Sequence, residues 1–169
     1  MPVTCSKGCQ AKFLDLSSFD TSNVTDMSYM FSLCKAESLD LSSFDTSSVT
    51  DVSGMFWACK VKSLNLSNFD TSSVTDMGSM FKECKAESLD LSSFDTSSVT
   101  CMRWMFHSCK LKSLDLSNFD TSNVRDMMGI FAWCKVEFLE TADERILAKW
   151  NECQAESLDL SSFDTSSII

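Results

Sequence analysis

The stretch LDLSSFDTSSVTDVSGMFWACK, which runs from Leu39 to Lys60, decides the fold because it is one copy of an internal repeat. Close variants of its first nine residues begin at Leu14, Leu64, Leu89, Leu114 and Leu158. From Leu14 to Leu114 the starts are 25 residues apart, and the unit is complete in five repeats, numbered here 1 to 5. A fixed period of this length indicates a solenoid, in which one supersecondary unit stacks on the next.

Each repeat carries two hydrophobic periodicities. In repeat 2, Leu39 and Leu41 alternate with Asp40, which is typical of a short strand with one buried face. Residues 45–47, Asp-Thr-Ser, follow with side chains that favour turns and helix caps. Apolar residues then recur every three or four positions, as on one face of a short helix: Val49, Val52, Met55, Phe56 and Cys59. The sequence therefore predicts an α/β repeat solenoid with one short strand and one short helix in each 25-residue coil.

The pattern divides the chain into four parts. Residues 1–13 form a partial coil or cap, residues 14–138 hold the five repeats, and residues 158–169 begin a final partial repeat. Between them, residues 139–157 break the pattern with an inserted helical segment. Thr141 and Glu144 have the spacing of a capping box, and apolar residues follow at helical spacing, so we predict an α-helix over Thr141–Cys153. The sequence leaves the role of this helix open.

The segment LDLSSFDTSNVTDMSYMF, from Leu14 to Phe31, resembles the unit of the BspA-like leucine-rich repeat surface proteins, also described as the DUF285 lipoprotein repeat family. The resemblance covers nearly the whole chain apart from residues 140–154. It implies a leucine-rich-repeat-type solenoid with adhesive roles, at the cell surface or secreted, and without catalysis. The return segments CKAES and CKVKS depart from the family, which usually has a Gly/Ser-rich turn there.

Composition excludes several classes of partner. The net charge of −10 argues against a surface that follows nucleic-acid phosphates or docks on anionic lipid. No apolar run is long enough to span a bilayer, and residues 1–10 contain no apolar stretch typical of a signal peptide. Because there is one histidine, no CxxC pair and no glycine-rich calcium loop, we expect no metal and no other cofactor.

Six of the nine cysteines recur once per repeat, at the end of the apolar stripe: Cys9, Cys34, Cys59, Cys84, Cys109 and Cys134. Buried free thiols and disulfides between neighbouring repeats are both compatible with this spacing. Cys101 lies outside the series, in the position that Asp26, Asp51, Asp76 and Asp126 hold in the other repeats. We expect Cys101 to be exposed and open to oxidation.

Two pairs of positions in each predicted helix vary although their neighbours hardly change. On a helical wheel they lie opposite the buried stripe, and three of the four tryptophans, the only tyrosine and the only histidine occur there. Neutral drift would favour small and charged residues, whereas Trp, Tyr and Arg dominate binding hot spots. The candidate partner-binding residues are Tyr29, Leu33, Trp57, Lys82, Glu83, Arg103, Trp104, His107, Arg125 and Trp133.

These observations favour a non-enzymatic recognition or adhesion module that binds a protein or glycan through the variable face. The alternative is a structural spacer or a repeat protein that assembles end to end, because the last repeat stops at Ile169 without a polar cap. An enzyme is disfavoured, since no nucleophile–base pair or phosphate-binding loop is evident. Ser43, Asn68, Ser93 and Asn118 alternate, which fits either duplication of a two-repeat block or an engineered consensus scaffold.

Overall fold

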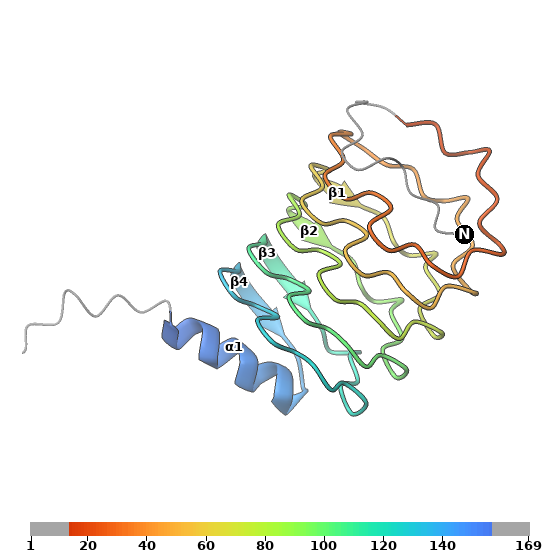
Figure 1. Ribbon diagram of the computed structural model, residues 1–169. Coiled ribbons are helices and arrows are strands. Elements are labelled where there is room, and N and C mark those ends of the chain that lie inside the picture. Colours follow the sequence, from red (N-terminus) through yellow and green to blue (C-terminus); the bar gives the residue numbers. More distant parts are fainter. Residues whose placement is uncertain (1–13, 157–169) are drawn as a thin grey trace, which may run out of the picture.

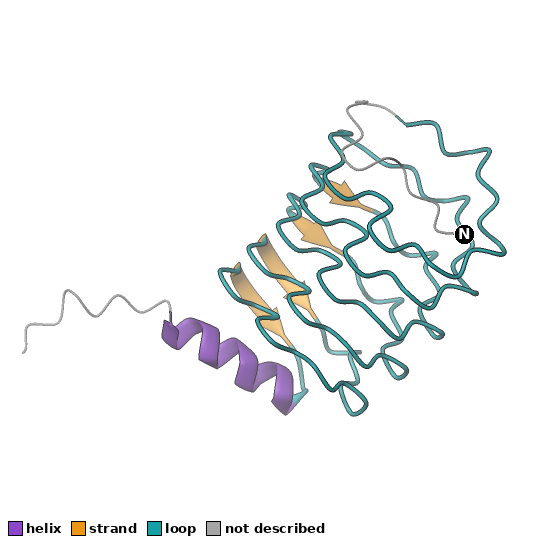
Figure 2. Ribbon diagram, viewed as in Figure 1, coloured by secondary structure: helices purple, strands orange, loops and turns teal. Residues whose placement is uncertain are grey.

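The computed structural model describes residues 14–156, so the expectations for residues 1–13 and 158–169 lie outside the described part of the chain. Its elements are β1 (Ser63–Leu64), β2 (Ser88–Leu89), β3 (Lys110–Asp115), β4 (Lys135–Glu140) and α1 (Glu144–Glu156). Successive repeats lie side by side as turns of one stack, with the strands along one side and α1 beyond β4 (Figures 1 and 2).

The strands pair in parallel with a register of one repeat. Ser63 faces Ser88 in the β1–β2 pair, and Lys110 faces Lys135 in the β3–β4 pair. Residues in the same position of consecutive repeats therefore lie next to each other. Strands are present at the starts of repeats 3, 4 and 5 and directly after repeat 5, and only the last pair extends beyond two residues. The starts of repeats 1 and 2, including Leu39–Leu41, contain no strand, so the predicted strand is wrong there.

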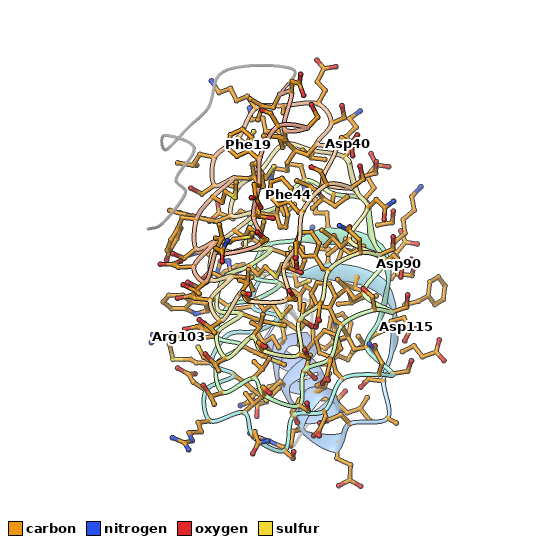
Figure 3. All side chains as sticks on the ribbon, turned by 90° about the vertical axis from the view of Figure 1, so that its right-hand side faces the viewer. Phe19, Asp40, Phe44, Asp90, Arg103 and Asp115 are labelled. Atoms are coloured by element: carbon orange, nitrogen blue, oxygen red, sulfur yellow. The ribbon has the colours of Figure 1, made fainter. Side chains whose placement is uncertain are left out.

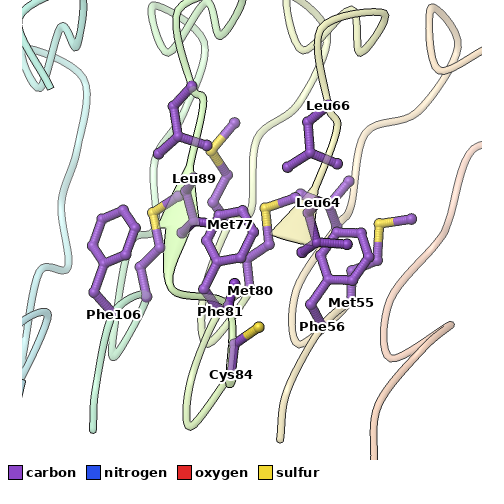
Figure 4. Packing of buried hydrophobic residues seen from close by; sticks show 14 of the residues in the cluster. Met55, Phe56, Leu64, Leu66, Met77, Met80, Phe81, Cys84, Leu89 and Phe106 are labelled. Carbon is purple, nitrogen blue, oxygen red and sulfur yellow. The ribbon is translucent and has the colours of Figure 1, made fainter. Parts of the chain in front are cut away.

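A column of phenylalanine rings runs through the core. Phe31, Phe56, Phe81, Phe106 and Phe131 lie one per repeat, with ring centroids 5.8–5.9 Å apart and planes within 13° of parallel. Figure 4 shows the rings of repeats 2 to 4 in a row, with methionine and leucine side chains packed beside them. All five are at most 1% exposed, so each repeat buries its ring only between its neighbours. The apolar positions predicted for repeat 2 are also buried, from Val49 to Cys59.

The predicted helix of each repeat is wrong, because residues 14–143 contain no helix. In repeat 1 three overlapping β-turns occupy residues 27–34, closed by hydrogen bonds of 3.1–3.2 Å from each of three N–H groups to the carbonyl three residues earlier. The N–H groups between them, starting with Met27, donate instead to carbonyls of repeat 2 at 2.7–2.9 Å. We call residues 27–34, 52–59, 77–84, 102–109 and 127–134 the turn segments.

The turns replace the helix for two physical reasons. Tyr29 and Leu33 have φ of 56° and 57°, in the left-handed region, which interrupts a right-handed helix. Stacking also gives every second N–H group a carbonyl of the next repeat as its hydrogen-bond acceptor. In an isolated helix, those N–H groups would need acceptors within the helix itself. Consecutive turns repeat about every three or four residues, as helical turns do, so the apolar spacing alone does not distinguish the two.

A second set of contacts joins the repeats through the Asp-Thr-Ser residues, which we call the DTS segments (residues 20–22, 45–47, 70–72, 95–97 and 120–122). The Thr46 hydroxyl donates to the Asp70 carbonyl at 3.0 Å and accepts the Asp70 N–H at 2.8 Å. Thr21, Thr71 and Thr96 make the same pair of bonds. These threonines are buried, so each hydroxyl serves both backbone groups of the next repeat.

Helix α1 covers the last repeat and takes over these contacts. The Asp143 carboxylate accepts the Thr121 hydroxyl at 2.6 Å, where an aspartate backbone would lie in a further repeat. Arg145 donates to the carbonyls of Thr121 and Val124, and the Trp150 ring lies edge-on against Phe131 at 5.5 Å. Within the described residues, α1 thus closes the end of the stack that follows repeat 5 (Figure 1).

The predicted capping box is wrong by two residues. Asp143 is the N-cap, because its Oδ1 accepts the N–H groups of Arg145 and Ile146 at 2.8 and 3.0 Å. Thr141 instead accepts the Asp143 N–H at 3.1 Å. Asp143 is the better cap here because one carboxylate satisfies both the helix end and the last repeat.

The recurring cysteines form no disulfides at the five described positions, from Cys34 to Cys134, and all five are buried. Burial raises the pKa of Cys59 and of Cys134 to about 12. The Cys109 thiol donates to the Phe81 carbonyl at 2.9 Å. These residues pack as small apolar side chains, and Cys9 lies outside the described residues.

Candidate interaction surface

The turn segments present the variable residues, and the second residue of each variable pair has a left-handed backbone. Their φ values lie between 51° and 63° at Tyr29, Leu33, Gly54, Ala58, Ser79, Glu83, Trp104, Ser108, Gly129 and Trp133. A hydrogen-bonded turn with positive φ at its third residue is a type II turn, which favours glycine there. Eight of these ten positions hold a residue other than glycine. At these eight positions a side chain therefore projects from a backbone conformation that glycine would adopt with less strain.

Five predicted residues form one cluster across repeats 1 to 4. The rings of Tyr29 and Trp57 meet edge to face, with centroids 6.1 Å apart. The Lys82 ammonium lies 5.7 Å from the Trp57 ring and 4.9 Å from the Trp104 ring. The Arg103 guanidinium lies 4.2 Å from the Trp104 ring. Cation–π contacts at these distances hold aromatic and cationic side chains in one arrangement.

Two glycines make room for the rings of this cluster. Gly54 lies under Tyr29, where a β-carbon would stand 2.4 Å from ring carbon Cε1. Gly129 lies under Trp104 in the same way, with 2.4 Å to Cδ1. In both cases the ring belongs to the repeat before the glycine, so the identity of one variable residue restricts its neighbour in the next repeat.

Three nitrogen atoms of the turn segments are buried without a hydrogen-bond partner: Trp57 Nε1, Arg103 Nε and His107 Nδ1. Burial lowers the pKa of His107, and the charge of Lys82 lowers it further, so the imidazole is neutral at pH 7. Buried polar atoms are almost always paired, so three in one region mark a place where the chain alone does not satisfy its polar groups.

The predicted residues differ in exposure, which corrects the expectation that all variable positions face solvent. Trp133 is 81% exposed, and Leu33 and Tyr29 are 43% and 41% exposed. Trp57, Lys82, Glu83, Arg103, Trp104 and His107 are half-buried. Ser32 and Gly78, also at variable positions, are buried. A helix would turn both residues of a pair outward, whereas in these turns exposure differs from pair to pair: Leu33 is exposed and Ser32 buried, but Met128 is more exposed than Gly129.

Arg125 lies apart from this cluster and lines a hollow between repeat 5 and α1. Sequence reasoning also missed two exposed apolar residues, Phe138 on β4 and Met128, which are 73% and 49% exposed. Phe138 stands where repeats 1 to 4 carry Ser38, Ser63, Ser88 and Ser113, and that replacement was the available signal.

One series of aspartates lies on another side of the stack. Asp40, Asp90 and Asp115 stand on the side opposite Arg103 (Figure 3). Each accepts the N–H of the serine two residues later, at 2.9–3.1 Å. Hydrogen bonds from the serine side chain and backbone lower the pKa of these carboxyls. These three carboxylates are therefore engaged locally and lie away from the cluster around Arg103.

Cys101 is half-buried rather than exposed. Burial raises the pKa of its thiol, as do the charges of Asp76 and Asp126 in the repeats on either side. A raised pKa leaves less of the nucleophilic thiolate at neutral pH. Oxidation of Cys101 stays a prediction, for which this environment is less favourable than an exposed one.

No group of three or more His, Cys, Asp or Glu side chains in residues 14–156 is arranged to hold a metal ion. The described helix is too short and too polar to cross a bilayer.

Comparison with known proteins gives one match. The family model described as "Mycoplasma protein of unknown function, DUF285" matches residues 7–86, 37–140 and 58–169. The three matches overlap, as expected when one model fits several registers of a repetitive chain. No curated protein and no solved structure matches the chain.

Proposed function

This chain belongs to the DUF285 family, and we propose that it is a non-enzymatic recognition module that binds a protein or glycan partner through its turn segments. We further propose that the stack is a leucine-rich-repeat-like solenoid of the BspA-like kind, and that it acts at the cell surface or after secretion. The family match supports a repeat protein, and the surface of the turn segments supports recognition.

Trp133 is the observation that carries the proposal. Its side chain is 81% exposed, so burial contributes little to keeping a tryptophan there. Its backbone has φ of 58°, a conformation that costs a residue with a β-carbon about 1–2 kcal/mol. Since neither packing nor backbone geometry favours tryptophan at this position, contact with a partner is the remaining physical reason for it.

The cluster around Lys82 supports the same interpretation. Trp57 and Trp104 are restrained by contacts with their neighbours, so a partner would meet side chains that have already lost much of their rotational freedom. Restrained aromatic anchors are typical of binding hot spots.

End-to-end assembly has less support. Helix α1 occupies the end of repeat 5 and satisfies the Thr121 hydroxyl that a further repeat would use. A second molecule stacked on this end would have to displace the contacts of Asp143, Arg145 and Trp150. If the assembly model were right, the mass in solution would rise with protein concentration.

The proposal is tested by screening arrayed glycans and extracellular proteins with the full chain, and then measuring the affinity of Trp133→Ser for each ligand found. Phe138→Ser is the matched control, because it also removes an exposed aromatic and restores the serine of repeats 1 to 4. We expect Trp133→Ser to weaken binding at least tenfold and Phe138→Ser to leave it unchanged. Equal losses in both variants would indicate nonspecific adhesion of aromatics and would reject the turn segments as the binding surface.

A further inference from the structure

A hollow of about 420 Å³ lies between repeat 5 and α1 and has a composition unlike the rest of the chain. Its lining residues are Arg125, Met127, Met128, Arg145, Ala148 and Lys149. Three of them are cations, although the protein carries a net charge of −10. Its volume lies within the range of sites that hold small molecules, roughly 300–1,000 Å³.

Arg125 breaks the repeat at this hollow. The other four repeats have threonine in its place, and the hydroxyl of Thr100, for example, donates to the Thr75 carbonyl at 3.1 Å. Arg125 keeps the backbone bond to the preceding repeat, from its N–H to the Thr100 carbonyl at 2.8 Å. Within residues 14–156 its guanidinium has no hydrogen-bond or ion-pair partner, so its side-chain donors are available.

The other two cations already have partners, Arg145 across the junction and Lys149 within α1. Arg145 donates to the carbonyls of Thr121 and Val124, which carry no charge to neutralise it. Lys149 pairs with Glu152 at 2.7 Å on α1, and its side chain is still 39% exposed. One free guanidinium therefore stands beside two positioned cations.

The remaining lining is apolar. Met128 is 49% exposed, and Ala148 on α1 is also exposed. The nearest carboxylate in sequence, Asp126, accepts the Met128 N–H at 2.8 Å and lies 3.9 Å from the Arg103 guanidinium, so it is engaged with other groups. The hollow combines positive charge with uncovered apolar surface.

We propose that this hollow binds a small amphiphilic anion, a molecule that joins a phosphate or carboxylate to a short apolar group. The anionic group would lie against Arg125 with Arg145 and Lys149 nearby, and the apolar group would lie against Met128 and Ala148. Such a ligand would also bridge repeat 5 and α1. This site adjoins the turn segment of repeat 5, which supplies Met127 and Met128, but its proposal does not depend on the proposed function.

The test uses phenyl phosphate and inorganic phosphate as probes in calorimetric titrations of the full chain. We expect phenyl phosphate to bind, and inorganic phosphate to bind at least fivefold more weakly because it lacks an apolar group. Equal affinities would overturn the amphiphilic character of the site. Absence of phenyl phosphate binding at millimolar concentration would overturn the site itself.

Arg125→Thr is the decisive variant, because threonine is the residue of the other four repeats and preserves the fold. We expect it to weaken phenyl phosphate binding about tenfold or more. Lys60→Thr, which removes one exposed positive charge away from the hollow, is the control and should bind as the unmodified chain does. Undiminished binding by Arg125→Thr, or an equal loss in Lys60→Thr, would show that the hollow does not hold the anion.

Discussion

The DTS segments and the turn segments join the same repeats by different means. In the DTS segments a buried threonine side chain holds the next repeat, as Thr71 does with the backbone of Asp95 at 2.8 and 2.9 Å. At the variable positions of the turn segments, backbone N–H groups donate to the next repeat whatever side chain the residue carries, while the stacked phenylalanines of the same segments supply the buried contacts. The contrast explains why one segment hardly changes between repeats while the other accepts Tyr, Gly, Ser and Trp at one position.

Thr71→Val should produce the largest effect, because valine keeps the shape of threonine and removes the hydroxyl. The Asp95 N–H and carbonyl would lose the partner they share, and an unsatisfied buried polar group costs about 1–3 kcal/mol. We expect the free energy of unfolding to fall by about 2 kcal/mol in urea denaturation.

Thr75→Val is the control for that change. The Thr75 hydroxyl is exposed and donates to the Thr50 carbonyl, which also accepts the Thr75 N–H, so its loss should cost less than about 0.5 kcal/mol. Similar losses at both threonines would mean that the buried hydroxyl has no special part in joining the repeats.

Gly54→Ala should have the next largest effect, in the turn segment of repeat 2. Its φ of 61° disfavours a β-carbon, and that carbon would also displace the Tyr29 ring. We expect a loss of about 1–2 kcal/mol in the free energy of unfolding, measured by thermal or chemical denaturation.

Ala58→Gly in the same turn segment is the matched change in the opposite direction. Ala58 has φ of 51°, and glycine there should raise stability, by up to about 1 kcal/mol. If Gly54→Ala were neutral and Ala58→Gly destabilising, the left-handed conformation of these positions would be wrong.

Acid should weaken the stack to a smaller extent, through exposed carboxylates such as that of Asp70 in a DTS segment. The Ser72 side chain, together with its backbone N–H, lowers the pKa of the Asp70 carboxyl below its usual value. A carboxyl whose pKa is lower in the folded chain than in the unfolded chain stabilises the fold at pH values above the unfolded pKa, which is near 3.9. This stabilisation is lost as the pH falls through the pKa of the folded chain. The melting temperature should therefore be level from about pH 7 to pH 5 and fall below about pH 4.

Ser72→Ala tests the cause of this fall. Without the serine hydroxyl, the Asp70 pKa should move up toward its ordinary value, which NMR titration of the carboxyl can follow. An Asp70 that titrates at the same pH with and without the hydroxyl would show that the hydrogen bond does not set its pKa.

The sequence alone predicts the period, the buried positions and the inserted helix, because all three depend on spacing. Residues 25 positions apart do lie together, and Val49, Met55 and Phe56 are buried as predicted. The helix in each repeat is wrong because overlapping turns place apolar residues at nearly the same intervals. The left-handed φ of Tyr29 or Trp133 could not be predicted, because tyrosine and tryptophan rarely adopt it. Only the glycines at the same position of other repeats, Gly54 and Gly129, indicate a left-handed backbone there.

The candidate surface could be predicted in part. Tyr29, Trp57 and Trp104 were identified from their rarity and position, and they do lie in one cluster. The hollow beside Arg125 could not be predicted, because it depends on where α1 packs against repeat 5. The Asp143 cap was missed for the same reason, since its carboxylate also bonds to Thr121 in the last repeat.

The most direct test of the central claim, that the turn segments carry side chains kept for recognition rather than folding, is the free energy of unfolding of Trp133→Gly measured beside Trp133→Ser. Glycine removes the strain of a φ of 58° while little packing is lost, so we predict a gain of about 1 kcal/mol for glycine and almost no change for serine. A loss of stability in both variants would contradict the claim, because Trp133 would then be needed for the fold itself.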